Sequence, residues 1–192
     1  NAGSELRVDE ITALAFLNTD VAASFAGVAW LILAWAIEKK PKFVGLLTGA
    51  VAGLATITPA AGFVSTSSAV IIGIGSGVVC YFAVAMKNKL KWDDALDVWG
   101  VHGVGGILGT ICLGLFGSTA INAAGANGLL FGGADFFFKQ VVAVVGASVY
   151  AFAFTYVMLV IINAITPVRT SDTEESSLDE ALHGETAYIE GI

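Results

Sequence analysis

His102 is the residue of this chain best suited to chemistry, because it is one of only two histidines and lies within the apolar, glycine-rich stretch DVWGVHGVGGILG. A neutral imidazole carries one hydrogen-bond donor and one acceptor, and it exchanges a proton near neutral pH. An ionisable side chain in a hydrocarbon environment is costly and needs a partner or a function. The residue alone leaves two interpretations open: a structural histidine bonded to a neighbouring helix, or a residue on a pathway for a proton or a small polar species.

Acidic side chains lie at the start of this stretch. Asp94 and Asp97 fall where the apolar run begins, and capping together with the favourable interaction of acids with a helix N-terminus accounts for them. Asp20 is different, because it lies about nine residues into another apolar run. A carboxylate there must face a partner, a polar cavity or a subunit contact, or be protonated, and the sequence does not choose among these.

The other reactive side chains form no catalytic arrangement. The sequence has no nucleophile motif, no metal-ligand spacing and no phosphate-binding loop, so we expect neither an enzyme nor a metal or cofactor site. The glycines around His102 follow no strand, which excludes a dinucleotide-binding turn. Cys80 and Cys112 lie inside apolar runs and are interpreted as small packing residues.

The composition of the chain indicates a membrane protein. Hydrophobic residues make up 56% and charged residues only 13% of the sequence, with a mean hydropathy of +0.82. Soluble domains carry about 25% charged residues. Residues 43–86, 98–134 and 140–168 contain no Asp, Glu, Lys or Arg. Since a membrane-spanning helix needs about 20 apolar residues, each segment has room for one or two spans.

We therefore expect an all-α, polytopic transmembrane helical bundle over residues 1–169, followed by an acidic tail over residues 170–192. Its spans are predicted at about residues 11–37, 43–61, 67–86, 95–116 and 136–165. The last span ends before Pro167, which cannot donate to a continuing helix. If the fourth span begins near residue 95, His102 lies about 11 Å along it, near the middle of a hydrocarbon core about 30 Å thick.

Small residues recur within these spans at helix-packing intervals. Glycines four residues apart occur as Gly49 and Gly53, and again as Gly73 and Gly77. Such spacing lets helix backbones approach closely in lipid, so it predicts a dense bundle.

Basic residues predict the orientation of the bundle. Seven lie in the loops on one side of the membrane, and two, Arg7 and Lys139, lie on the other. The seven are Lys39, Lys40, Lys42, Lys87, Lys89, Lys91 and Arg169. An excess of Lys and Arg marks the cytoplasmic side, which places the C-terminal tail in the cytoplasm. The tail holds seven acidic residues and no Lys or Arg, so no nucleic-acid-binding surface is expected.

Four motifs together resemble one protein family. The stretch DVWGVHGVGGILG is similar to the signature around the second pore histidine of the ammonium transporter family (Amt/Mep/Rh). The motifs NAGS, GAVAGLATITPAAGFV and LDEALHGETAY resemble further family motifs of the Amt branch, in the same order. The resemblance implies a fold of about eleven helices, built as two inverted repeats plus a last helix. This chain resembles the C-terminal half, from the end of the sixth helix to the cytoplasmic tail.

The resemblance also implies roles for individual residues. His102 matches the second pore histidine, Ser4 matches the serine that helps recruit ammonium at the outer vestibule, and Val98 would line the apolar lumen. The tail matches the cytoplasmic segment that packs under a neighbouring subunit and bears on regulation by PII signalling proteins. Its matching residues are His183, Gly184 and Tyr188. Asp20 matches no functional residue of the family.

The implied function is transport of ammonium or ammonia through an apolar pore in a multi-pass protein of the cell membrane, assembled as a homotrimer in the lipid bilayer. An apolar pore excludes hydrated alkali cations because it offers no ring of oxygens to replace their water. The alternative is an ammonium sensor of the same fold that signals through its cytoplasmic tail. Without the first repeat, this chain alone is not expected to enclose a pore.

Overall fold

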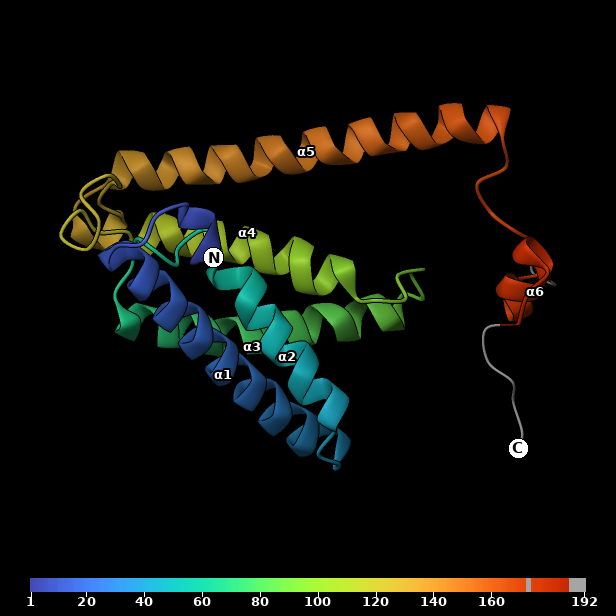
Figure 1. Cartoon of the computed structure of the whole chain (residues 1–192), viewed down its shortest axis with the longest axis horizontal. Helices are drawn as coiled ribbons and strands as arrows, with labels where there is room; N and C mark the ends of the chain where they lie inside the picture. The colour runs from blue at the N-terminus through green and yellow to red at the C-terminus, as the bar shows by residue number, and fades with distance from the viewer. Residues whose placement is uncertain (172–173, 187–192) are drawn as a thin grey trace. The chain divides into compact units, whose positions relative to one another are not determined.

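The computed structural model describes residues 1–171 and 174–186, apart from the side chain of Ser176, and every regular element in these residues is a helix (Figure 1). The longer helices are α1 (Glu10–Glu38), α2 (Phe43–Ile57), α3 (Thr66–Lys89), α4 (Val104–Phe116) and α5 (Ala134–Ile165). The shorter ones are η1 (Gly3–Glu5), η2 (Trp99–Gly103), η3 (Leu129–Phe131), η4 (Glu175–Ser177) and α6 (Leu178–His183). The predicted all-α class is confirmed.

The chain forms two compact units, of which the first is Asn1–Val145 and the second begins at Gly146, within α5. Among the described residues, four helical segments are by length and composition apolar enough to cross a membrane: α1, α3, α5 and the continuous stretch Trp99–Phe116. Helix α2 is also apolar, but its 15 residues make it shorter than the predicted span over residues 43–61. Its regular helix ends two residues before Pro59, and the chain then turns back towards α3.

Local sequence signals set the start and end of α1. The Asp9 carboxylate accepts hydrogen bonds from the backbone N–H groups of Ile11 and Thr12, at 2.9 and 3.1 Å. The Thr12 hydroxyl accepts one in return from the backbone of Asp9, which completes a capping box. The helix stops where Lys39 takes a left-handed conformation with φ of 63°. These bounds differ from the predicted span by a single residue at each end.

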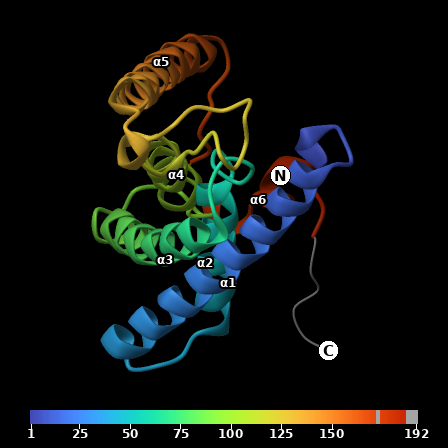
Figure 2. The ribbon, with the colours of Figure 1, turned by 90° about the vertical axis from the view of Figure 1, so that its left-hand side faces the viewer.

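Close backbone contacts hold α1 against α2 and α3 (Figure 2). A Cβ atom added at Gly53 of α2 would lie 2.5 Å from the carbonyl oxygen of Ala22. Added at Gly73 of α3, it would lie 2.6 Å from the same oxygen, and at Gly77 it would lie 2.5 Å from that of Ala26. No side chain fits at these distances, so the dense packing that the glycine spacing predicts is confirmed for these helices.

A buried asparagine in the first third of α1 binds the turn between α2 and α3. Asn18 is 0% exposed, and its side-chain amide donates to the carbonyl oxygens of Ala61 and Val64, both at 2.9 Å. The irregular backbone between the two helices thereby gains hydrogen bonds that it cannot form with itself. The sequence analysis assigned no role to Asn18.

The fourth apolar helix begins later than predicted. Residues 95 and 96 form a turn, Asp97 is left-handed with φ of 56°, and the helix starts with the π-helical segment η2 before continuing as α4. A right-handed helix cannot run through a left-handed residue, so the predicted start at residue 95 is wrong. The predicted depth of about 11 Å for His102 along this helix therefore does not hold, and the contacts of the neighbouring residues define its level.

The second unit contains most of α5 and the short helices of the tail. No residue of α5 is buried within the described chain. The helix ends at Ile165, two residues before Pro167, as predicted. Helix α6 ends at His183 and is capped by Gly184, whose φ of 66° suits glycine and whose backbone N–H donates to the carbonyl of Glu180 at 3.0 Å.

Candidate functional site

His102 lies in η2, and its side chain is exposed in this chain. The residue before it, Val101, is only 3% exposed and packs with Cys80 and Val84 of α3. Val98, four residues before His102, is 49% exposed. The segment therefore turns one face towards α3 and leaves Val98 and His102 uncovered.

Within the part of the chain that the structure describes, His102 has no hydrogen bond, ion pair or ring contact. The structural interpretation, in which a neighbouring helix bonds the imidazole, therefore finds no partner in these residues. A π-helical turn widens the helix locally, and such turns occur frequently at functional sites.

The level of His102 in the bundle follows from the residues that pack on either side of it. A Cβ atom at Gly100 would lie 2.7 Å from a methyl carbon of Val84, and one at Gly105 would lie 3.5 Å from the Cys80 sulfur. Cys80 and Val84 lie about 21 and 27 Å from the start of α3 at 1.5 Å per residue. His102 is thus level with a point about two-thirds along the 24 residues of α3, about 10 Å from the end at Lys89.

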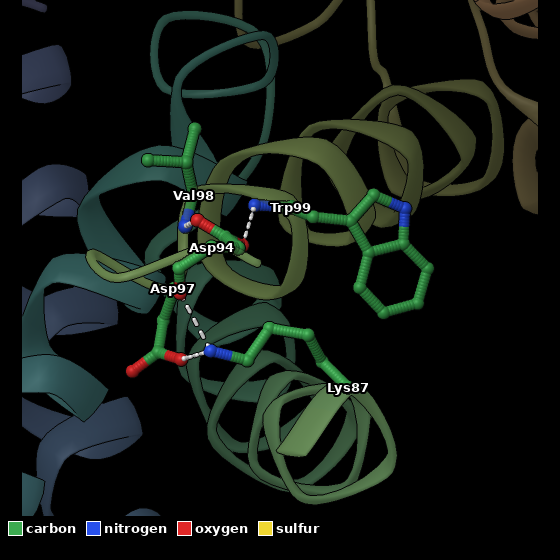
Figure 3. Close-up of polar contacts among 5 residues, drawn as sticks. All are labelled: Lys87, Asp94, Asp97, Val98 and Trp99. Atoms are coloured by element: carbon green, nitrogen blue, oxygen red, sulfur yellow. Dashed lines mark hydrogen bonds and ion pairs between the residues drawn. The ribbon is translucent and has the colours of Figure 1, made fainter. Parts of the chain in front are cut away.

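Asp94 binds the first turn of η2 with both carboxylate oxygens. They accept from the backbone N–H groups of Val98 and Trp99, each at 2.9 Å (Figure 3). These are two of the N–H groups that a helix start leaves without an internal partner. The sequence analysis proposed a capping role for Asp94 from its position alone, and this geometry is the one that such a role requires.

Among the residues described, Asp97 does not bind backbone N–H groups through its carboxylate as a helix cap does; it binds a lysine. Its carboxylate lies 2.6 Å from the ammonium of Lys87, which also donates to the backbone carbonyl of Asp94 at 2.6 Å (Figure 3). Lys87 is only 5% exposed. The ion pair therefore joins the last turn of α3 to the loop that precedes η2.

The burial of Lys87 was not expected from the sequence, where this lysine was placed among the basic residues of the loops. A signal was present: Cys80, Val84 and Lys87 follow one another at helical spacing, and the first two belong to the buried stripe of α3. A lysine that continues a buried stripe is rarely solvated and needs a partner for its charge.

Ser4 lies at the opposite end of the bundle from Lys87. It is exposed in η1, beside a hollow of about 190 Å³ that is lined among others by Ile11 at the start of α1 and Thr58 after α2. The described chain does not bring Ser4 and His102 together.

Asp20 is also exposed, and it lines a hollow of about 350 Å³ with Asn1, Phe16 and Leu54. The side-chain amide of Asn1 donates to the Thr19 hydroxyl at 2.9 Å, so the surroundings of Asp20 are partly polar. No ion pair involving Asp20 occurs among the described residues. The sequence left four possibilities for Asp20: a partner, a polar cavity, a subunit contact or protonation. In the described chain Asp20 lines a partly polar hollow.

The residues assigned to the tail lie partly within the described region. His183 and Gly184 form the exposed end of α6, while Tyr188 lies outside the described residues. Within the described ranges, no group of three or more His, Cys, Asp or Glu side chains is placed to hold a metal ion.

Comparison with known proteins points to one family. A sequence model of the Ammonium Transporter Family matches residues 1–188. An ammonium transporter from Bacillus subtilis (strain 168) is 45% identical over 194 residues, which cover 100% of this chain and 48% of that protein. The chain therefore spans about half the length of this relative.

Solved structures show the same partial match. The crystal structure of Saccharomyces cerevisiae Mep2 is similar with a TM-score of 0.84 and 32% sequence identity, covering 90% of this chain and 40% of that one. A structure described as a sensor Amt protein is similar with a TM-score of 0.80 and 30% identity, covering 92% of this chain and 43% of that one.

Proposed function

Because this chain belongs to the ammonium transporter family, we propose that the complete protein carries ammonium or ammonia across the cell membrane. The observation that carries the proposal is the uncovered face at the start of this apolar helix, where the side chains of Val98 and, four residues later, His102 are both exposed in the described chain. The second half of a two-repeat transporter needs such a face, because the pore forms where the repeats meet.

Each site residue has a distinct part in this mechanism. An apolar wall that includes Val98 offers no oxygens to replace the hydration shell of potassium or sodium, so these ions stay out. Ammonium can release a proton and cross the apolar stretch as ammonia. His102 would accept or donate a hydrogen bond to that species along the way. A relay of the released proton through His102 is a further step of the same hypothesis.

Ser4 would bind ammonium at the outer entrance of the pore. Its exposed hydroxyl lies beside a hollow at the end of the bundle away from Lys87, where a hydroxyl can accept a hydrogen bond from ammonium. We further expect a homotrimer and a cytoplasmic tail that responds to a PII signalling protein through His183 and Gly184.

The test is ammonium-evoked current from the complete protein in liposomes, compared with the variants His102→Ala and Ile107→Ala at equal protein content. Ile107 is a suitable control because it is exposed on the same helix five residues later, and so points in a different direction. A current that is lost or altered only in His102→Ala supports the pore. A current that is the same in the wild type and His102→Ala contradicts it.

A sensor is the second candidate, because the chain is similar to a structure described as a sensor Amt protein. This alternative predicts no ammonium current from the complete protein, with ammonium binding still detectable by calorimetry. The same liposome experiment therefore separates the two functions.

A further inference from the structure

Lys87 combines two features that a surface lysine lacks. Its side chain is only 7% exposed, and its ammonium has two acceptors at 2.6 Å, the Asp97 carboxylate and the Asp94 carbonyl. A buried ammonium persists only where such partners replace its water. Both acceptors belong to the loop before η2 rather than to α3, so the bonds of Lys87 define where this loop lies.

The loop in turn defines the start of η2. Asp97 has a left-handed backbone with φ of 56°, a conformation that costs free energy for any residue with a Cβ atom. Its carbonyl accepts from Val101, and the Asp94 carboxylate accepts from Val98 and Trp99. Both acceptors of the lysine therefore come from residues that also bind the first turn of the segment that carries His102.

We propose that Lys87 is a positioning residue for the pore: through its bonds to Asp94 and Asp97 it sets the direction and register of η2, and with them the places of Val98 and His102. The backbone connects Asp97, the partner of Lys87, to the exposed face: Val98 directly follows Asp97, and His102 follows one turn later. This inference rests on the proposed transport function, although it concerns residues that touch no substrate.

The expected consequence is a change in transport rather than only in folding. Lys87→Met keeps the length of the side chain and removes its charge, so the loop loses its anchor and leaves the Asp97 carboxylate unpaired. Because small misplacements of a positioned group lower rates strongly, we expect ammonium current to fall by about 10- to 100-fold. We also expect the selectivity for ammonium over potassium to fall, which a loss of folded protein alone does not change.

The experiment measures ammonium and potassium currents of the complete protein in liposomes, normalised to folded protein. Lys89→Met is the matched control, because Lys89 lies in the same last turn of α3 and is exposed. Lys87→Arg should retain most of the selectivity, since it keeps the cation. In Asp97→Gly the backbone can keep φ near 56° without strain but the carboxylate is lost, so this variant tests the ion pair if Lys87→Met fails to fold.

The outcomes separate the two proposals. Loss of selectivity in Lys87→Met or Asp97→Gly, with Lys89→Met unchanged, supports the positioning role. Wild-type current together with unaltered selectivity in both ion-pair variants overturns it and leaves transport intact. Absence of ammonium current in the wild type overturns the proposed function instead.

Discussion

The two faces of the helix formed by η2 and α4 have opposite surroundings, although each carries a valine near its start. One face, with Val101, Gly105 and Gly109, is buried against α2 and α3. The other, with Val98 and His102, is uncovered in this chain. The buried face has its partners in this chain, whereas the side chains of Val98 and His102 have no covering helix among the described residues.

The space beside the glycines of this helix differs between the two faces. A Cβ atom at Gly109 would run into the backbone carbonyl of Thr56, and one at Gly105 would lie 2.8 Å from the Thr56 hydroxyl. At Gly106 such an atom would meet nothing within 4 Å. Glycine on the buried face thus allows two helices to touch, while Gly106 leaves open space close to His102.

Gly109→Ala should give the largest effect on stability, because the added methyl group overlaps backbone that cannot move aside. We expect a loss of about 3 kcal/mol in the free energy of unfolding, the upper end of the usual cost of overpacking a core. Thermal unfolding of the purified complete protein in detergent measures it. A variant as stable as the wild type would show that α2 and α4 are not in backbone contact there.

Ser76→Ala tests the polar side of the same packed region and should cost less. The buried hydroxyls of Ser76 and Thr56 are 2.8 Å apart, and removing one leaves the other without this bond. Hydrogen bonds between membrane helices contribute about 1 kcal/mol, so we expect a decrease of that size. The same unfolding assay checks it, and a loss equal to that of Gly109→Ala would contradict this ranking.

Val98→Thr changes the uncovered face at nearly constant volume. The free energy of unfolding should change by less than about 0.5 kcal/mol, because Val98 is half exposed and threonine has nearly the same shape. The added hydroxyl gives a passing ion an oxygen ligand, so potassium current should rise relative to ammonium current. If the ratio of the two currents stays the same, Val98 does not line the pore.

Gly106→Ala is the one of these four variants that should cause no loss of stability. The added methyl group meets no atom within 4 Å in this chain, and alanine favours helix by up to about 1 kcal/mol over glycine. We therefore expect unchanged or slightly raised thermal stability. Marked destabilisation of the complete protein would show that the other half of the molecule packs closely over this position.

The site was only partly predictable from the sequence. The role of Asp94 followed from its position before an apolar run, because capping depends on residues a few positions away. The pairing of Lys87 with Asp97 did not, because it depends on how the loop between them folds, and a left-handed Asp97 has no clear sequence signal. For the same reason the start of the fourth helix was placed too early.

Apolar runs, their breaks and their small-residue spacing determined the helices of this protein, because helix formation and membrane burial depend on local composition and periodicity. The family was indicated by the resemblance of four short motifs. Only the tertiary structure decided which of those residues are buried against one another and which stay uncovered. Lys87 and His102 illustrate the limit: one is a charged residue that folds inward, the other an ionisable residue that stays outward. Their surroundings come from segments distant in sequence, so no local pattern could fix them.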